Sequence, residues 1–533
     1  MLVAPSRPCA RLLSDGARLA LEKSTSNVVR TLAGSDNVST QTAFLRMYPI
    51  SWRFRIPTLV VWTAAIGYAC LATYFSLRRH DAFRSGFDLA NFDQVLWLLA
   101  NGYEPLNTQT GRLFWGDHFS PTIALLTPFY VLGAGPSTLL VLQAVTVALV
   151  APLLFALARA YDASPWLASI PALLWLFSPL TLIPNVNEFH HVPVVAPLIV
   201  GSVLALARDR VVVFAVLGLL ACGAKEDVSL LYVMLGLVVA FEGRRRFGAA
   251  ISAAALGIFL FAVGIFVPAF SDSIAWFQKR FSGGRGESLS DIAIWIVSHP
   301  LAALGDLLTV ENLVLCAALV IATGGLCLLA PRWMLLGLPV LAHNLLSAYG
   351  PQHGLQDHYQ VPIALSFAIA AAVGVHRLSS FGPRVRMSAA ATIALAIFVS
   401  PVGVRQVKEQ SEWSSEVSAY TGAEPARRAG IALIPDDVAL AASTRLTPHL
   451  AHRVELYTLP LPFLGREELG TDWSQEEMTR RAARVRWVIL DTNDQPLEYP
   501  RTAELMGPLL RRHGFREIGR WGSVSVHVRD ETR

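Results

Sequence analysis

Charged side chains are scarce in this sequence. Asp, Glu, Lys and Arg make up only 16% of its 533 residues, whereas a soluble domain carries roughly 25%. The deficit is concentrated between residues 56 and 403, which excludes a soluble globular protein. The net charge of +5 is small for this length. It argues against nucleic acid as a partner and is typical of basic loops that orient membrane helices.

Cysteine is also rare, and its spacing is uninformative. The five cysteines form no CxxC pair, and four of them lie inside apolar runs. This pattern predicts neither a disulfide framework nor a zinc site. The cysteines are Cys9, Cys70, Cys222, Cys316 and Cys327.

Residues 1–50 lack the apolar core of a cleavable signal peptide. We therefore expect them to form a disordered cytoplasmic tail. Met47 stands just before the basic segment 51–55, so Met1 and Met47 are both candidate start residues.

Long apolar runs dominate the rest of the sequence. A helix needs about 20 apolar residues to cross the hydrocarbon core of a membrane. Six runs meet this length clearly, and three are slightly shorter. The clear runs are 56–77, 138–158, 166–184, 249–270, 313–330 and 333–349; the shorter ones are 192–207, 361–375 and 388–403.

Two further apolar runs, 211–224 and 228–241, flank the charged segment Lys225-Glu226-Asp227. They could form one long crossing or a hairpin. Basic residues stand at both outer ends of the pair, at 208–210 and 244–246, and basic loops lie in the cytoplasm. Both ends then lie on one side, which predicts a hairpin and a total of about eleven crossings. The run 119–132 is short and holds two prolines, so we expect it to be interfacial or re-entrant.

This count predicts three parts. The cytoplasmic tail 1–50 precedes a transmembrane domain over 51–403, whose long first outer loop covers 78–136. Residues 404–533 are richer in charge and contain strand-like runs at 438–442, 453–459, 487–491 and 524–528, with a helical segment at 475–485. We expect a small extracytoplasmic α/β domain there. The fold class is thus an all-α polytopic membrane protein with a C-terminal α/β domain.

Ionisable residues next to the apolar runs converge on the outer face in this map. Such residues at membrane depth are energetically costly and usually functional, so their convergence predicts one site at the outer membrane boundary. The residues are Asp88, Asp93, His118, Glu188, His190, His191, Lys225, Glu226, Asp227, His353, Asp357 and His358.

Several of these residues also have a structural interpretation. Asp88 could simply cap the helix that follows it, and Asp93, some 140° further round that helix, would point elsewhere. His118 could only begin the interfacial segment. Glu188 with His190 and His191 resembles a metal cluster, but adjacent histidines are poorly placed to bind one ion together. The charges at 225–227 could neutralise one another.

Four motifs in order carry a family resemblance. They are GFDLANFDQ at 86–94, DHFSP at 117–121, NEFH at 187–190 and KED at 225–227. Together they resemble the domain-of-unknown-function 2079 family of predicted bacterial membrane proteins, over about residues 52–530. That family is similar to the GT-C glycosyltransferase superfamily, which takes sugars from polyprenyl-phosphate carriers.

The resemblance implies a membrane glycosyltransferase of the bacterial plasma membrane. It would transfer a sugar from a polyprenyl-phosphate donor, with inversion, to an extracytoplasmic glycan, lipid or protein acceptor. Asp88 would be the base, with Asp93 assisting it, and Lys225 would bind the phosphate. The other substrate-binding residues would be His118, Glu188, His190, Glu226, Asp227 and His358. Leu89 replaces the acidic neighbour common in GT-C enzymes, and Ala224 replaces the threonine before the lysine.

Two other functions remain open. A transporter or flippase for a lipid-linked or charged solute would also need ionisable residues near the membrane. A non-catalytic scaffold would need none of them in place. The sequence assigns no cofactor, and it leaves a divalent metal ion such as Mg²⁺ or Mn²⁺ open.

Overall fold

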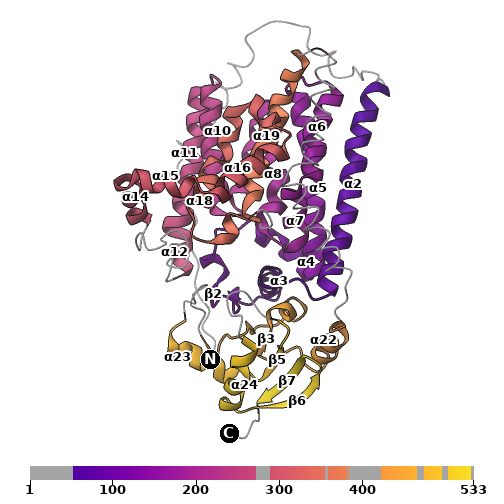
Figure 1. Ribbon diagram of the computed structural model, residues 1–533, viewed down its shortest axis with the longest axis vertical. Coiled ribbons are helices and arrows are strands. Elements are labelled where there is room, and N and C mark those ends of the chain that lie inside the picture. Colours follow the sequence, from indigo (N-terminus) through magenta and orange to yellow (C-terminus); the bar gives the residue numbers. More distant parts are fainter. Residues whose placement is uncertain are drawn as a thin grey trace, which may run out of the picture. The chain divides into compact units, whose positions relative to one another are not determined.

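The computed structural model describes residues 52–271, 289–354, 358–380, 382, 422–464, 473–494 and 502–529. The chain divides into two units, 1–55 and 56–533, and apart from residues 52–55 at the start of one helix the features below lie in the second. It is mostly helical, with a sheet near the carboxyl end of the chain (Figure 1).

The first half of the chain supplies the helices that surround the candidate site. They are α2 (Trp52–Asp81), α3 (Phe87–Ala100), α4 (Thr127–Val131), α5 (Pro136–Ala160), α6 (Pro165–Phe177), α7 (Pro179–Asn187), α8 (His191–Ala207), α9 (Val211–Cys222) and α10 (Glu226–Phe241). The later helices are α11 (Arg245–Phe261), α12 (Val267–Phe270), α14 (Leu289–Ser298), α15 (Pro300–Leu307), α16 (Val310–Ala322), α17 (Pro331–Met334), α18 (Leu338–Leu346) and α19 (Val361–Gly374).

Local sequence explains where several of these helices begin. Pro136 opens α5 and Pro165 opens α6, positions where a missing N–H costs nothing and the fixed φ suits a helix. Ser164 also accepts a hydrogen bond from the N–H of Leu167, which satisfies one of the free donors of the first turn. The run 119–132 forms only the short helices η3 (Ile123–Leu126) and α4, consistent with its two prolines.

Four described helices are long and apolar enough to cross a membrane: Ile56–Asp81, Pro136–Ala160, Arg245–Phe270 and His358–Ser380. Two bent pairs, Pro165–Phe177 with Leu180–Asn187 and Pro300–Leu307 with Val310–Ala322, raise this number to six if each is one span. The expected eleven crossings stay a prediction. One of them, 388–403, lies outside the described residues.

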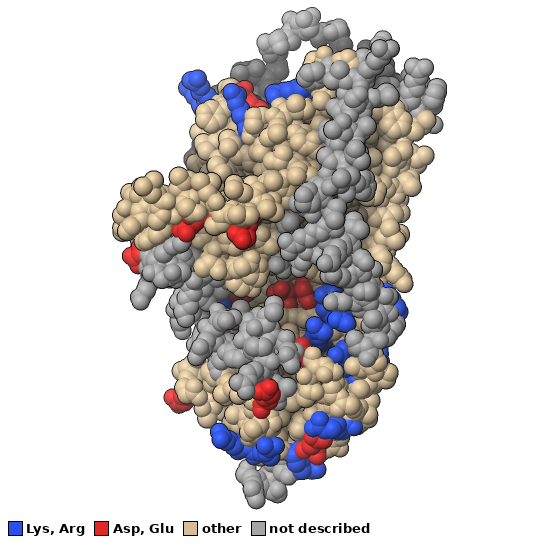
Figure 2. Space-filling model, viewed as in Figure 1, with Lys and Arg blue, Asp and Glu red and all other residues tan. Residues whose placement is uncertain are grey.

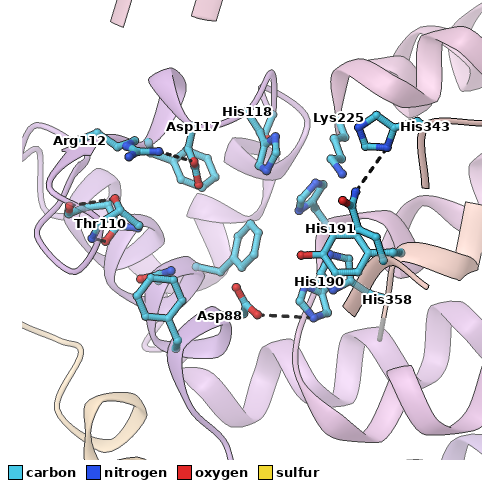
Figure 3. Close-up of a pocket in the computed structure, with 18 residues that line it drawn as sticks. Asp88, Thr110, Arg112, Asp117, His118, His190, His191, Lys225, His343 and His358 are labelled. Atoms are coloured by element: carbon cyan, nitrogen blue, oxygen red, sulfur yellow. Dashed lines mark hydrogen bonds and ion pairs between the residues drawn. The ribbon is translucent and has the colours of Figure 1, made fainter. Parts of the chain in front are cut away.

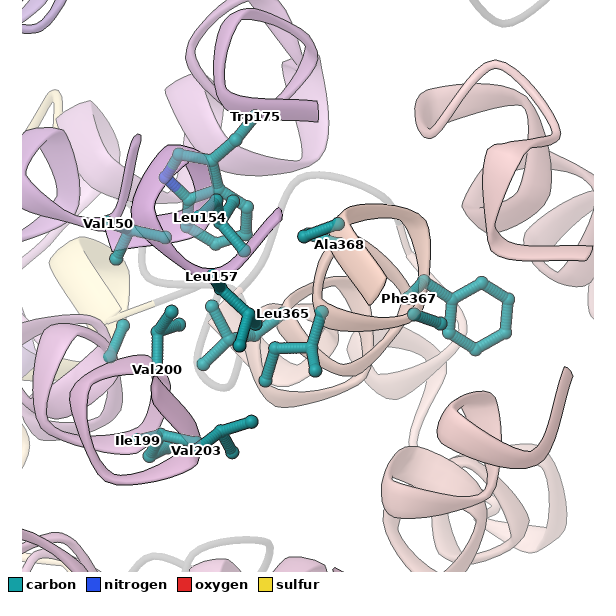
Figure 4. Packing of buried hydrophobic residues seen from close by; sticks show 14 of the residues in the cluster. Val150, Leu154, Leu157, Trp175, Ile199, Val200, Val203, Leu365, Phe367 and Ala368 are labelled. Carbon is teal, nitrogen blue, oxygen red and sulfur yellow. The ribbon is translucent and has the colours of Figure 1, made fainter. Parts of the chain in front are cut away.

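The main apolar core lies between the long helices. Leu154 and Leu157 of α5 pack there with Trp175 of α6, Val200 of α8 and Leu365 of α19, all buried (Figure 4). The indole N–H of Trp175 donates to the backbone oxygen of Val147 at 3.0 Å, so its one polar atom is satisfied inside the core. Helix α19 is buried along its whole length.

The carboxyl-terminal sheet has five strands in the order β4-β3-β5-β7-β6. Strands β4, β3 and β5 are parallel, whereas β7 is antiparallel to β5 and β6. Their bounds are β3 (Leu440–Ala442), β4 (Leu456–Thr458), β5 (Trp487–Asp491), β6 (Phe515–Trp521) and β7 (Val524–Arg529). Helices α22 (Glu424–Ile431), α23 (Gln475–Arg484) and α24 (Thr502–Arg512) accompany them. The predicted strands correspond to β3, β4, β5 and β7, and β6 was missed.

Charge is unevenly spread over the visible surface. Lys and Arg side chains gather at the end of the helical region far from the sheet and again around the sheet (Figure 2). The helical surface between them is largely uncharged, apart from a few carboxylates. An uncharged band of this kind is typical of a surface that faces lipid.

Candidate active site

A polar cavity of about 110 Å³ lies where α3, the segment 107–120 and the starts of α8 and α10 meet (Figure 3). Six of the residues predicted to converge on the site line it: Asp88, His118, His190, His191, Lys225 and His358. Asp93, Glu188, Glu226 and Asp227 do not line the cavity. Glu188 contacts α3, Glu226 contacts His118 and Asp227 contacts Lys225, whereas Asp93 lies on α3 itself. His353 does not line the cavity either, and Asp357 lies outside the described residues.

Glu188 holds the amino end of α3, the helix that bears Asp88. Its carboxylate accepts hydrogen bonds from the N–H of Gly86 at 2.5 Å and of Leu89 at 3.2 Å. Because Gly86 is the N-cap residue, the interpretation of Asp88 as the cap is wrong. Asp88 instead lies in the first turn, with its side chain 43% exposed. Burial raises the pKa of Glu188 to about 7, against the opposing effects of Arg79 and the two N–H donors.

The segment after His118 is docked on the junction between α9 and α10. The N–H of Thr122 donates to the oxygen of Gly223 at 2.8 Å, and the Ser120 hydroxyl donates to that of Ala224 at 2.9 Å. A Cβ at Gly223 would lie 2.5 Å from Oγ1 of Thr122, so the close contact between the two segments requires glycine at this position. The docking places a histidine of the first loop beside the charged residues 225–227.

His118 pairs with Glu226 at that junction. Nδ1 of His118 lies 2.9 Å from Oε1 of Glu226, and the N–H of Phe119 donates to Oε2 at 3.0 Å. Burial alone would lower the pKa of His118, but the Glu226 carboxylate outweighs it and holds this pKa above its ordinary value. The imidazole therefore tends to carry a positive charge beside the cavity.

Lys225 reaches the cavity from the same junction. Nζ of Lys225 lies 3.0 Å from Oδ2 of Asp227. Burial opposes the charge of Lys225, but Asp227 and Glu226 together raise its pKa above the ordinary value. The ammonium is therefore retained at the cavity wall. Asp227 neutralises it in part, as expected if the charges at 225–227 neutralise one another.

The segment Glu188–His190 is fixed by a buried glutamine. Gln143 of α5 donates from Nε2 to the backbone oxygen of Glu188 at 2.8 Å, and its Oε1 accepts from the N–H of His190 at 2.7 Å. Nε2 of His190 faces Oδ2 of Asp88 at 3.8 Å. Burial and then Lys225 lower the pKa of His190 to about 3, so this imidazole is neutral and the contact is not an ion pair. The ring of His358 stacks on His190 with centroids 3.4 Å apart.

Asp93 is buried on the other side of α3. It accepts a hydrogen bond from the Tyr130 hydroxyl at 2.7 Å. Nε2 of His452 lies 3.3 Å from its Oδ1 and 3.2 Å from its Oδ2, and only the first contact has hydrogen-bond geometry. Gln94 donates to the backbone oxygen of Arg453 at 3.2 Å. These contacts bind α3 to the segment between β3 and β4.

No group of three or more His, Cys, Asp or Glu side chains is arranged to hold a metal ion in the described part of the chain. The carboxylate of Glu188 is engaged by α3, and that of Glu226 by His118. The metal interpretation of residues 188–191 therefore gains no support from the geometry of these side chains.

Several lining residues were not among the predicted site residues. Asn91 stands three residues after Asp88 on α3, so helical periodicity could have shown that both occupy one face. Beside His358, which was predicted, His343, Gln352 and Tyr359 line the cavity from the later part of the chain. The additional polar lining residues are Asn91, Asn107, Thr110, Arg112, Asp117, Ser120, His343, Gln352 and Tyr359.

A family model described as a predicted membrane protein (DUF2079) matches residues 79–525. No curated protein matches the sequence significantly. Among solved structures, ArnT from Cupriavidus metallidurans bound to undecaprenyl phosphate is 14% identical, with 88% of this chain and 98% of that chain covered and a TM-score of 0.48. Its apo state is 13% identical, with 87% and 98% covered and a TM-score of 0.47.

Proposed function

Since the chain belongs to the DUF2079 family of predicted membrane proteins, as its motifs indicated, we propose that it is a membrane glycosyltransferase. It transfers a sugar from a polyprenyl-phosphate donor to an extracytoplasmic acceptor and inverts the anomeric carbon. The acceptor is a glycan, a lipid or a protein. The observation that carries this proposal is that a carboxylate, Asp88, and an ammonium, Lys225, line the same cavity.

The carboxylate of Asp88 and the ammonium of Lys225 suit the acceptor and the leaving phosphate, respectively. A displacement at the anomeric carbon needs a base that takes the proton of the acceptor hydroxyl and a cation that stabilises the departing phosphate. Asp88 is the base in this proposal, because its carboxylate lines the cavity and is partly exposed. Lys225 binds the phosphate, because its ammonium stays charged at the cavity wall. One base and one direct displacement give inversion.

The remaining predicted residues divide into two groups in this proposal. His118, His190 and His358 line the cavity and contact the donor or the acceptor. Glu188, Glu226 and Asp227 hold α3, His118 and Lys225 respectively. Asp93 has no place at the cavity wall, so we assign it the positioning of α3. A divalent metal ion has no step in this scheme.

We also propose the membrane orientation that the basic loops indicated. Eleven crossings place the amino terminus in the cytoplasm and residues 404–533 outside the cell as a soluble α/β domain. The cavity then opens at the outer boundary of the membrane. There the polyprenyl tail of a donor stays in the bilayer while its phosphate reaches Lys225.

Purified protein in lipid nanodiscs, supplied with a panel of polyprenyl-phosphate sugars and candidate acceptors, tests the proposal. The expected result is release of the sugar-free polyprenyl phosphate, with no release by the Asp88→Asn variant. Movement of the intact glycolipid across a sealed vesicle without its consumption would support a flippase instead. No turnover and no transport with any donor, at normal folding, would contradict both activities.

A further inference from the structure

Two buried side chains at the cavity wall carry polar atoms that have no hydrogen-bond partner among the described residues. Asn91 is 7% exposed and His191 is 4% exposed. Oδ1 of Asn91 and both ring nitrogens of His191 have no partner among the described residues. A buried polar atom left unpaired costs about 1–3 kcal/mol, and most such atoms in folded proteins are satisfied. These three atoms therefore need a partner that the described chain does not supply.

Both residues stand next to the proposed reaction centre. Asn91 follows Asp88 by three residues on α3, and His191 adjoins His190 at the start of α8. The ring of His191 contacts that of Phe92, at a centroid distance of 5.3 Å, and that of His118, at 5.5 Å. Ring contacts thus orient it, and among the described residues no hydrogen bond holds its two ring nitrogens.

The pattern of donors and acceptors indicates the chemistry of the missing partner. A neutral imidazole offers one donor and one acceptor, and the carboxamide oxygen of Asn91 is an acceptor. An anionic group could not donate to the two acceptors, one on His191 and one on Asn91, whereas a hydroxyl both donates and accepts. Neighbouring hydroxyls therefore match the one donor and two acceptors. A hydroxyl can also satisfy either orientation of the Asn91 carboxamide. Phe87 and Phe92 also line the cavity and offer apolar surface to the C–H groups of a ring.

We propose that Asn91 and His191 form a hydroxyl-binding subsite that recognises the sugar of the donor, separate from the phosphate at Lys225. The inference rests on the proposed function and deepens it. The subsite determines specificity: a sugar that lacks the matching hydroxyl leaves buried groups unpaired and binds more weakly.

Equilibrium binding to two carriers in nanodiscs tests the subsite. One carrier is sugar-free polyprenyl phosphate, and the other is the glycosylated carrier that binds tightest in the panel. The wild type should prefer the glycosylated carrier. Asn91→Leu and His191→Phe should each weaken binding of the glycosylated carrier about tenfold or more, the loss expected for one hydrogen bond in a buried site. Binding of the sugar-free carrier should stay unchanged.

Thermal unfolding without carrier separates this role from a structural one. Both variants replace unpaired polar atoms by apolar atoms of similar shape, so the Tm should stay equal or rise. Asn101→Leu, at the exposed C-cap of α3, and the exposed His299→Phe make the same substitutions away from the cavity and are matched controls for carrier binding. If either cavity variant fails to fold, Asn91→Ala or His191→Gln takes its place.

The outcomes separate the two proposals. If the variants keep the wild-type preference for the glycosylated carrier, or lose Tm without losing that preference, the subsite is wrong and the phosphate site stands. Equal binding of both carriers by the wild type also overturns the subsite alone. Failure of the wild type to bind either carrier overturns the proposed function and the subsite with it.

Discussion

His452, in the segment between β3 and β4, lies 3.2 Å from the buried carboxylate of Asp93 on α3. Strand β4, which follows this segment, meets the first loop where the Thr108 hydroxyl donates to the oxygen of Leu456 at 2.5 Å and accepts from its N–H at 3.0 Å. Because β4 is an edge strand, Thr108 satisfies backbone groups that the sheet leaves unpaired. The C-terminal sheet is therefore part of what positions the helix of Asp88.

The contact between Asp93 and His452 predicts that substitutions of the two residues lower the free energy of unfolding by different amounts. Asp93→Leu leaves the buried Tyr130 hydroxyl without its acceptor, which should cost about 1–3 kcal/mol of unfolding free energy. His452→Phe keeps the stack on Trp97 and removes a contact whose histidine is 41% exposed, so it should cost at most about 1 kcal/mol. Chemical denaturation measures both. Faster hydrogen exchange of α3 amides in Asp93→Leu would show the positioning role; unchanged exchange would contradict it.

Much of the C-terminal sheet could be predicted from sequence, because β3 and the middle of β5 are runs of buried apolar residues and β7 alternates valines with polar residues, Val524 and Val526 being buried. Strand β6 was missed for a physical reason. It is an edge strand whose middle residues are exposed, with Glu517 paired to Arg520, so it lacks the alternation of a half-buried strand.

The candidate site could be predicted only in part. Ionisable residues beside apolar runs indicated Asp88, His118 and Lys225, and the fold brings them to one cavity. The role of Glu188 could not be predicted, because nothing local shows that its carboxylate meets a helix start about 100 residues earlier. Helical periodicity could place Asn91 on the face of Asp88, but a lone asparagine on a helix is ordinary until its burial is known.

Asp88→Asn should abolish transfer and leave folding intact. Asparagine has nearly the same shape but cannot take the proton of the acceptor hydroxyl. The N-cap residue is Gly86, so a capping role of Asp88 cannot explain any loss. The measurement is single-turnover release of polyprenyl phosphate, with Tm as the folding check. An Asn variant that remains active would remove Asp88 from the proposed role.

The pair of His118 and Glu226 predicts a pH dependence of stability. The folded pKa of His118 is raised above 6.5, so the folded state binds the proton more tightly than the unfolded state. The stabilisation of the folded state by protonated His118 is therefore fully present below pH 6.5 and is lost as the pH rises through the folded pKa. Glu226→Gln removes the carboxylate that raises the pKa of His118. The other two charges near this imidazole act in opposite directions, because Asp117 raises its pKa and Lys225 lowers it.

Thermal unfolding of wild type and Glu226→Gln at a series of pH values measures this effect. The Tm difference should be largest below pH 6.5 and should shrink as the pH rises above that value. A difference that stays constant over the whole series would show that the two side chains interact without a proton.

The orientation can be tested by cysteine labelling. Helix α9 has 12 residues and would span only about 18 Å at 1.5 Å per residue, short of the roughly 30 Å hydrocarbon core. The parity of crossings therefore depends on the short helices. In a chain without its native cysteines, Glu476→Cys in the C-terminal domain should react with an impermeant maleimide in intact cells. Arg246→Cys should react only after permeabilisation. Protection of position 476 would reverse the orientation of this domain.

Lys225 and Asp227 allow the phosphate-binding and charge-pairing roles to be separated. Lys225→Met removes the ammonium but keeps most of the apolar stem, and it leaves Asp227 without its partner at 3.0 Å. The single variant should therefore lose stability as well as donor affinity. Adding Asp227→Asn removes the uncompensated carboxylate, so the double variant should recover most of the lost Tm.

Donor affinity should not recover with it. If Lys225 binds the phosphate, both the single and the double variant should bind the carrier lipid more weakly by about 1.5–3 kcal/mol, the worth of a hydrogen bond to a charged group. Asp227→Asn alone is the matched control and should keep carrier binding, because the ammonium remains. Should the double variant bind the carrier as tightly as the wild type, Lys225 would act only within the charge pair, and the phosphate site would lie elsewhere in the cavity.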